Sequence, residues 1–428
     1  MSELLLLKKE DCKSCYKCIR ECALKSIRFS ENRAQIVERE CVYCGHCYVT
    51  CPQSAKEIRR DTDKARALIA SGRPVIVSLA PSFIADFGVG GLDGMRQALL
   101  KLGFADVEET ARGARIVKTE YERMIASGEH KLIISSCCHS VNLLIQKRYP
   151  QALPYLAKVD SPMLAHAKSI KERVPGSAVV FIGPCISKKD EAEQYGQVDC
   201  VLTFDELIDW LAEEGIELPA GEQPDGTEAR SRFFPTAGGI IRSMDLDDGF
   251  SYIPIDGLRR CMDALEEIER GGMQNCFVEM NACEGSCIGG PVMHRYHSSP
   301  ITCKTRVEQY SGKSGRDFDD QPADDLRKSM QYIGSGAVKP GEAAIQEVLH
   351  KLGKYRPEDE LNCGTCGYST CREKAIAVFQ HKAEVSMCIP FMHEKAESMA
   401  NLVMETSPNI VLIVGDDMRI LEYSDVGE

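Results

Sequence analysis

The stretch CFVEMNACEGSCIGGP, residues 276–291, runs from an apolar, β-branched segment directly into a turn of small residues that carries Cys283 and Cys287. Its first half is typical of a buried strand. Three other segments are likewise short, largely apolar and rich in β-branched residues, namely 74–80, 131–136 and 178–183. Stretches with helical periodicity, most of them ending in glycine, separate these segments. This alternation predicts an α/β domain with parallel strands.

Cysteines follow three of these predicted strands. Cys137 and Cys138 come directly after 131–136, Cys185 follows 178–183, and Cys283 follows the strand at 276–280. Ligands of open α/β sheets bind beyond the carboxyl ends of the strands. We therefore expect thiols from three strand ends to converge on one buried site.

The composition narrows the class of protein. A chain of 428 residues is long enough for two to four domains. It contains 21 cysteines, and its start, MSELLLLKKEDC, has no secretory signal. We therefore expect a cytoplasmic protein whose clustered cysteines bind metal rather than form disulfides. A net charge of -12 argues against nucleic acid or an anionic membrane as a partner, and no apolar run approaches the roughly 18 residues of a membrane span.

Two N-terminal blocks, CKSCYKCIREC and CVYCGHCYVTCP, share the spacing C-x2-C-x2-C-x3-C. Three thiolates at this spacing wrap one iron-sulfur cube while the fourth points toward a second cube. We assign one 4Fe-4S cluster to Cys12, Cys15, Cys18 and Cys51, and a second to Cys41, Cys44, Cys47 and Cys22. Zinc, the alternative, is disfavoured because its sites use two separated pairs of ligands. Residues 1–60 resemble the two-cluster bacterial ferredoxins.

A third cysteine block lies near the C-terminus. Its spacing, C-x2-C-x4-C-x16-C, comes from Cys363, Cys366, Cys371 and Cys388. It resembles the single 4Fe-4S domain of several redox proteins, and we assign residues 353–394 to such a domain. Structural zinc is the weaker alternative, because Gly364 and Gly367 beside the ligands and a long helix before the last cysteine suit the cluster domain.

Three stretches in the middle of the chain, SSCCHS, GPCISKKDE and VEMNACEGSCIGGP, resemble in order the signature loops of the iron-only hydrogenases. SLAPSF and FPTAGGII agree with two further family motifs. The resemblance implies a catalytic α/β domain over 61–352, with two lobes of parallel sheets. It is preceded by the ferredoxin-like α+β domain and followed by the small 4Fe-4S domain.

The resemblance also implies a site. A cube would be bound by Cys138, Cys185, Cys283 and Cys287, with Cys287 bridging to a two-iron group that carries carbonyl, cyanide and a dithiolate bridge, together the H-cluster. Lys188 and Ser82 would donate to the cyanides, Glu191 would pair with Lys188, and Cys137 would relay protons after its environment lowers the pKa of its thiol. Glu120, with Glu122 beside it, is expected on the proton path.

Three positions depart from the family pattern: His139, Gly183 and Asn281 stand where a proline and two methionines are usual. Those methionines normally pack against the diiron group, so we expect a wetter or differently shaped pocket and altered turnover.

Three functions therefore stay open. The first is a hydrogenase that interconverts protons plus electrons with dihydrogen, of the PAS-linked sensory kind. The second is a hydrogenase-like iron-sulfur protein for electron transfer or assembly, without the diiron group. The third is a signalling module that reads cellular redox state.

The end of the chain, 395–428, combines a helical connector with PNIVLIVGDDMRILEYSD, a hairpin pattern that resembles the opening of a PAS sensor domain. A floppy tail or a truncation point is the alternative. Expected partners are dihydrogen and protons, a ferredoxin-like redox carrier, a signalling protein reached through the PAS-like region, and a second copy of the chain.

Four cysteines match no ligand set: Cys200, Cys261, Cys276 and Cys303. We predict simple buried packing for Cys200 and Cys276. Cys261 lies beside arginines on a predicted helix, which would lower the pKa of its thiol.

Overall fold

The computed structural model describes residues 4–219, 221, 228–293, 299–320 and 325–424. The chain divides into two compact units. The first unit comprises Met1–Asp11 and Glu38–Gly336, and the second comprises Cys12–Val37 and Ala337–Glu428.

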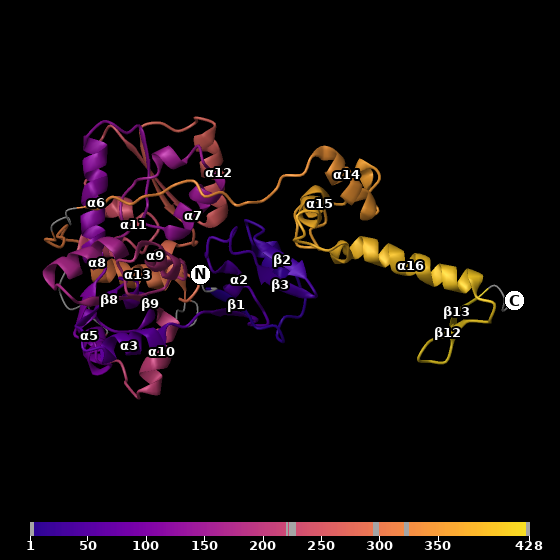
Figure 1. Ribbon diagram of the computed structural model, residues 1–428, viewed down its shortest axis with the longest axis horizontal. Coiled ribbons are helices and arrows are strands. Elements are labelled where there is room, and N and C mark those ends of the chain that lie inside the picture. Colours follow the sequence, from indigo (N-terminus) through magenta and orange to yellow (C-terminus); the bar gives the residue numbers. More distant parts are fainter. Residues whose placement is uncertain (1–3, 220, 222–227, 294–298, 321–324, 425–428) are drawn as a thin grey trace. The chain divides into compact units, whose positions relative to one another are not determined.

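A four-stranded parallel sheet forms one lobe of the first unit. Its strand order is β6 (Asp106–Glu109), β5 (Val75–Leu79), β8 (Ala178–Gly183), β9 (Cys200–Thr203). Every residue of β5, β8 and β9 is buried, because helices cover both faces of a parallel sheet. Figure 1 shows α3 (Thr62–Ala70), α5 (Leu92–Lys101), α8 (Pro162–Arg173) and α10 (Phe204–Glu213) around these strands.

A second parallel sheet, in the order β10 (Ser251–Asp256), β11 (Cys276–Asn281), β7 (Leu132–Ile134), forms the other lobe. The predicted parallel sheets and all four predicted strands are thus confirmed. The sequence did not indicate β10, because it contains Pro254 and is partly exposed. Proline is tolerated there because β10 is an edge strand, paired with β11 alone among the described strands.

The first unit contains further helices among its described residues. They are α2 (His46–Val49), α4 (Phe83–Asp86), α6 (Ala111–Ala126), α7 (His139–Arg148), α9 (Ser187–Tyr195), α11 (Gly239–Ser243), α12 (Leu258–Glu269) and α13 (Pro300–Ser311). Single 3-10 turns lie at Leu153–Tyr155, Arg230–Phe233 and Ser286–Gly289. The antiparallel pair β1 (Leu5–Leu7) and β4 (Lys56–Ile58) completes this unit.

The second unit consists of helices and two-stranded hairpins. Its N-terminal part has α1 (Lys17–Glu21) and the antiparallel hairpin of β2 (Ile27–Ser30) and β3 (Arg33–Ile36). Its C-terminal part has α14 (Glu342–Lys351), packed on α15 (Cys371–Phe379), and then α16 (Ile389–Thr406). Single 3-10 turns lie at Pro357–Asp359 and Val385–Met387.

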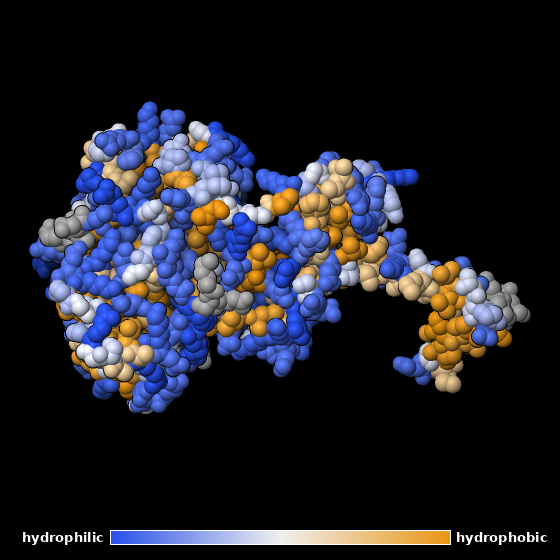
Figure 2. All heavy atoms as spheres, viewed as in Figure 1, coloured by the Kyte–Doolittle hydropathy of each residue, from blue (hydrophilic) through white to orange (hydrophobic). Residues whose placement is uncertain are grey.

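The predicted connector helix and hairpin at the end of the chain are both present. The helix is α16, and the antiparallel hairpin pairs β12 (Leu412–Val414) with β13 (Ile420–Tyr423). Both strands are exposed, and Figure 2 shows apolar side chains gathered over this hairpin. Among the described helices, none is both long and apolar enough to cross a membrane.

The cysteines without a predicted ligand role are buried. Cys200 lies in β9 and Cys276 in β11, so their predicted packing role is confirmed. The expected low pKa of Cys261 is wrong, since burial in α12 raises the pKa of this thiol, whose Sγ donates to the Asn281 carbonyl at 3.4 Å. Burial likewise raises the pKa of Cys303.

Candidate functional site

The four thiols expected at the central site line one cavity of the first unit, with about 380 Å³ of atom-free space. Cys138 precedes α7, Cys185 lies between β8 and α9, and Cys283 and Cys287 follow β11. Since β7 and β11 belong to one sheet and β8 to the other, the thiols meet where the carboxyl ends of both sheets face each other. The predicted convergence of three strand ends is therefore present.

The turn between Cys283 and Cys287 requires its small residues. Gly285 and Ser286 have positive φ angles of 79° and 65°, a conformation that bulky residues rarely adopt. A Cβ on Gly289 would lie 1.8 Å from the backbone oxygen of Glu284. The turn therefore closes only with glycine at this position, which sets Cys283 and Cys287 on the same wall of the cavity.

Burial dominates the acid-base properties of these thiols. It raises the pKa of Cys287 to about 12, and the neighbouring Cys185 and Cys138 sulfurs add to the rise. The pKa of Cys283 is raised for the same reasons, burial first. Four sulfurs that line one cavity become thiolates together only around a strongly positive group, and iron ions supply such charge. The donor set thus fits a thiolate-bound iron-sulfur cube.

The second N-terminal cysteine block reaches the same cavity. Tyr43 and Cys44 line it, and a Cβ on Gly45 would lie 2.5 Å from the Pro291 ring. Lys147 of α7 fixes this block by donating to the Cys41 carbonyl at 2.6 Å. Because α7 begins next to Cys138, one helix connects the two thiol sets.

Cys137 lies beside a phenol that the sequence did not single out. Its Sγ is 3.2 Å from the hydroxyl of Tyr121, which also accepts from the Ser136 amide at 2.9 Å. Burial raises the pKa of Cys137 to about 12, and the Tyr121 hydrogen bond and the Lys188 charge oppose this only in part. The expectation that the surroundings lower this pKa is therefore wrong.

The glutamates expected on the proton path point elsewhere. Glu120 pairs with Arg123 at 2.5 Å, and Glu122 accepts from the Asp245 amide at 2.8 Å. Tyr121 stands between them on the buried face of α6, with Val117 and Ile125 one turn away on either side. The i, i+4 spacing of these three residues is the sequence pattern that predicts a buried Tyr121. Glu120 is not among the described residues that line the cavity.

A buried ion-pair network supports Lys188. Its Nζ lies 2.5 Å from Glu191 Oε2 and donates to the Cys137 carbonyl at 3.1 Å. Glu191 also pairs through Oε1 with Lys328, a fully buried lysine that sequence reasoning missed. Burial opposes ionisation of Glu191, but the two lysines outweigh it and hold the pKa of this carboxyl below its usual range. The expected pair of Lys188 and Glu191 is thus present.

Ser82 is buried, and its hydroxyl has no hydrogen-bond partner among the described residues. An unsatisfied buried hydroxyl is costly. Such a group fits a ligand that accepts a hydrogen bond, as expected for a cyanide.

The three departures from the family pattern have local explanations. His139 is buried, and its Nε2 lies 2.7 Å from Asp190 Oδ2. The Asn281 amide donates to the buried Glu279 at 3.1 Å, which a methionine would not do. A Cβ on Gly183 would lie 2.7 Å from the ring of Phe181. The aromatic ring therefore occupies the space next to Gly183, and the expected difference in pocket shape stays a prediction.

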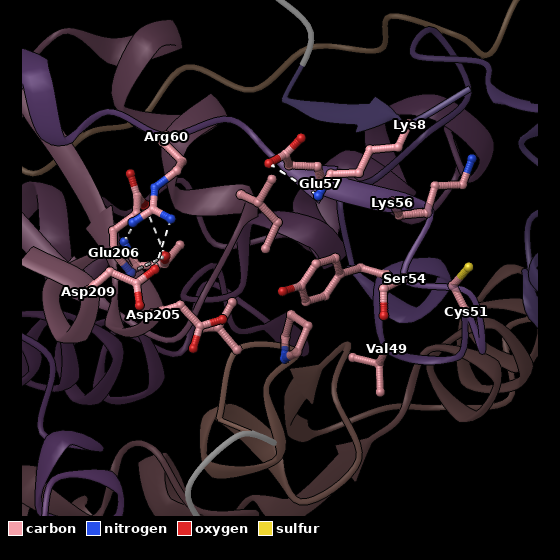
Figure 3. A pocket seen from close by; sticks show the side chains of 15 residues that line it. Lys8, Val49, Cys51, Ser54, Lys56, Glu57, Arg60, Asp205, Glu206 and Asp209 are labelled. Atoms are coloured by element: carbon pink, nitrogen blue, oxygen red, sulfur yellow. Dashed lines mark hydrogen bonds and ion pairs between the residues drawn. The ribbon is translucent and has the colours of Figure 1, made fainter. Parts of the chain in front are cut away.

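Cys51, the last thiol of the second block, lines a separate cleft of the first unit (Figure 3). Lysine, arginine and carboxylate side chains surround this cleft and pair with one another. Lys8 lies 3.7 Å from Glu57, and Arg60 lies 2.8 Å from Asp209. The Cys51 sulfur accepts from the Ala55 amide at 3.4 Å.

The first N-terminal block repeats this geometry in the second unit. The Cys22 sulfur accepts from the Ser26 amide at 3.4 Å, four residues on, as Cys51 does from Ala55. Ser14 and Tyr43 occupy matching positions with positive φ angles, and so do Tyr16 and Gly45. The two blocks thus fold alike, and the exchange of Cys22 and Cys51 between clusters stays a prediction.

The C-terminal thiols Cys363, Cys366, Cys371 and Cys388 line a second cavity, with about 350 Å³ of atom-free space. Thr370 caps α15 by accepting from the Glu373 amide at 3.0 Å, and the Cys371 amide donates to Asn362 at 2.8 Å. Gly364 and Gly367 have positive φ angles. The two cavities have similar size and the same four-thiol donor set, so both suit the same kind of group.

Comparison with known proteins decides the family. Residues 73–291 match the family model described as iron only hydrogenase large subunit, C-terminal domain. The chain belongs to this family. Residues 359–390 match an Fe-S cluster family model, and together the two matches support iron-sulfur cofactors.

The reported relatives of this hydrogenase-family chain are named either as a hydrogenase subunit or as iron-sulfur assembly proteins. It is 26% identical to the NADP-reducing hydrogenase subunit HndD of Solidesulfovibrio fructosivorans, over 65% of this chain and 60% of that protein. It is also 26% identical to the cytosolic iron-sulfur assembly component 3 of Rattus norvegicus, over 76% and 68% of the two chains. The cytosolic Fe-S cluster assembly factor NAR1 of Yarrowia lipolytica is 27% identical over 43% and 45%.

The chain therefore spans 60% of the hydrogenase subunit and 45% of NAR1. Among solved structures, a variant of the [FeFe]-hydrogenase HydA1 from Chlamydomonas reinhardtii is 20% identical over 63% of this chain and 91% of that chain, with a TM-score of 0.48.

Proposed function

We propose that this hydrogenase-family chain is an iron-sulfur protein that transfers single electrons, with a 4Fe-4S cube bound by Cys138, Cys185, Cys283 and Cys287. The observation that carries the proposal is the single cavity in which these four thiols meet. The three accessory clusters keep the ligand sets assigned from the spacing. Their partner would be a one-electron carrier of the ferredoxin class.

The chain's own residues give electrons a way to this cube. Cys44, assigned to the second N-terminal cluster, lies on the cavity wall, and the contact of Gly45 with Pro291 keeps the two thiol sets close. Lys147 holds the loop in place through the Cys41 carbonyl. An electron that arrives at the N-terminal thiols thus reaches the wall of the central cavity at Cys44.

In the version that the comparisons favour, the chain has no diiron group and works in electron transfer or in iron-sulfur assembly. Two of the reported relatives are named as assembly proteins, and one of them aligns over more of this chain than the hydrogenase subunit does. The polar Asn281 and the ring of Phe181 beside Gly183 support this version, since methionines normally pack against the diiron group at these two positions.

Hydrogen chemistry is the second candidate, and the surroundings of Cys137 and Lys188 favour it. A bound diiron group would supply the metal centre at which protons and electrons interconvert with dihydrogen. Lys188 would then donate to an anionic ligand, while Glu191 and Lys328 hold the ammonium in place. The Ser82 hydroxyl is available for a second anion. Cys137 would transfer protons toward the site, and the Tyr121 hydroxyl lies within hydrogen-bond distance of its Sγ.

This second candidate includes a sensory role. The terminal hairpin resembles the opening of a PAS domain, and its exposed apolar strands would continue into a sensor fold. A signalling protein and a second copy of the chain would then be the partners.

Infrared spectroscopy separates the two candidates. The protein would be reconstituted with iron and sulfide and then treated with a synthetic diiron complex, with Cys287→Ala as the control that lacks the bridging thiol. An electron-transfer protein shows no protein-bound carbonyl or cyanide bands. Bands that appear in the wild type only, and shift under hydrogen, would refute the first candidate and establish the second.

A further inference from the structure

In the second unit, the first N-terminal cysteine block packs against the loop that carries the C-terminal cysteines. Lys25 joins the two segments, because its Nζ donates to the Ile19 carbonyl at 3.1 Å, to the Arg20 carbonyl at 3.0 Å and to the Gly367 carbonyl at 2.9 Å. An ammonium carries three N–H donors, and these three carbonyls suit them. One side chain therefore connects segments 342 positions apart.

The packing is closest next to the metal-binding thiols. A Cβ on Gly367 would lie 3.1 Å from the Ile19 side chain and 3.4 Å from the Arg20 amide. Ile19 directly follows Cys18, and Gly367 directly follows Cys366. Both cysteines are buried. The positive φ of 92° and the close contact together explain why glycine stands at position 367.

Further contacts fix the orientation of the two segments. Arg20 donates to the Thr365 carbonyl at 3.3 Å. On the other side of the contact, the Phe29 amide donates to the Lys382 carbonyl at 2.8 Å, and the Glu31 amide donates to Glu384 at 3.3 Å. The hairpin of β2 and β3 thus lies along the loop that leads to Cys388. Contacts on two sides prevent the segments from rotating about Lys25.

We propose that the C-terminal thiol set and the first N-terminal thiol set form one electron-transfer pair, in which Lys25 is the positioning residue. The inference rests on the proposed function, since it takes both sets to hold cubes. A single electron leaves one reduced cube, which is thereby oxidised by one electron, and reduces the other cube by one. A carrier of the ferredoxin class supplies or removes that electron, and no proton or bond changes.

The pairing assigns a role to the C-terminal module. Cys363 is exposed while Cys366 is buried against the N-terminal block. The outer side of this thiol set is therefore open to a carrier, and its inner side faces Ile19. The C-terminal module therefore exchanges electrons between an external carrier and the N-terminal clusters, and does not act independently of them.

Electron paramagnetic resonance of the dithionite-reduced full chain tests the pair, because two nearby paramagnetic cubes broaden each other's signals and speed each other's relaxation. Lys25→Met removes the contact but no thiol. Lys17→Met is the matched control, since Lys17 is an exposed lysine of the same N-terminal block and its replacement removes the same charge. Cys371→Ala removes the C-terminal cube and gives the signal of the N-terminal cubes alone.

We expect Lys25→Met to keep the iron content of the wild type and to shift the N-terminal signals toward those of Cys371→Ala, while Lys17→Met matches the wild type. The pair is refuted if Cys371→Ala loses one cube's worth of iron yet leaves the relaxation of the N-terminal signals unchanged. Retention of all iron in Cys371→Ala would instead refute the C-terminal cluster itself, and with it that part of the proposed function.

Discussion

The two four-thiol cavities of this chain have similar size but are built differently. The central one takes its four assigned cysteines from loops up to 149 positions apart in sequence, since Cys138 and Cys287 both line it. A buried ion-pair network of Lys188, Glu191 and Lys328 contacts the carbonyl of the adjacent Cys137. The C-terminal one is formed by a single segment of 26 residues, Cys363–Cys388. A local loop suffices to hold a cube that only passes electrons. Two buried lysines, Lys354 and Lys374, also line the C-terminal cavity, but no carboxylate is among the described residues that line it.

Thiol reactivity gives the largest expected contrast between the cavities. In metal-free chain, burial raises the pKa of Cys283 well above the ordinary range of a thiol, and the neighbouring Cys185 and Cys138 sulfurs add to the rise, whereas the hydrogen bond from Thr365 lowers the pKa of the exposed Cys363. Only the thiolate reacts, and each unit of pKa changes its fraction about tenfold, so at pH 8 Cys363 should be alkylated more than about tenfold faster than Cys283. The rate at Cys283 should rise as the pH is raised above 8. Peptide mapping after timed alkylation measures both rates, and equal rates at pH 8 would contradict the difference.

Removal of the buried Glu191 carboxylate should have the next largest effect, on the free energy of unfolding. Glu191→Gln leaves Lys188 and Lys328 buried without their counter-charge, and we expect a loss of about 3–5 kcal/mol in the free energy of unfolding. Urea denaturation followed by circular dichroism measures this. Glu342→Gln, which breaks an exposed pair with Arg372 in the second unit, is the control and should leave the midpoint unchanged. If Glu191→Gln and Glu342→Gln lower the free energy of unfolding by equal, small amounts, the buried ion pairs of Glu191 do not form as described.

Glycine replacements compare the two loops directly. Gly289→Ala places a Cβ 1.8 Å from the Glu284 oxygen and should cost about 3 kcal/mol, with loss of iron from the central site. In the C-terminal loop, Gly364→Ala meets nothing closer than 3.8 Å and should cost only about 1 kcal/mol, from its positive φ. Denaturation midpoints and iron analysis check both variants. A larger loss at Gly364 than at Gly289 would reverse the comparison.

The smallest expected effect concerns Tyr121. Tyr121→Phe removes the hydroxyl that contacts Cys137 and accepts from the Ser136 amide, and this should cost about 1 kcal/mol. Tyr43→Phe is the control, since Tyr43 lines the same cavity from the N-terminal block. If the second candidate function holds, Tyr121→Phe should also slow hydrogen turnover without changing iron content. Unchanged stability would mean that the hydroxyl is replaced by water.

The sequence predicts those features that depend on neighbouring residues. Strands β7, β8 and β11 are short, buried and mostly apolar, and the thiols that follow them lie where parallel strands place their ligands. Lys328 was missed because its partner Glu191 is 137 positions away, and no local pattern connects such a pair. Helical periodicity places Tyr121 on the buried face of α6. The acidic side chains of Glu120 and Glu122 were the more obvious candidates for a proton path, although the structure turns both away from the cavity.

The central claim is that the cavity of Cys138, Cys185, Cys283 and Cys287 binds one 4Fe-4S cube, and iron analysis combined with Mössbauer spectroscopy of the reconstituted Cys283→Ala variant tests it most directly. Cys261→Ala is the matched control, because Cys261 is a buried thiol outside every assigned ligand set. We predict that Cys283→Ala loses one cube's worth of iron relative to the wild type and that Cys261→Ala loses none. Full retention of iron in Cys283→Ala, or an equal loss in both variants, would contradict the account.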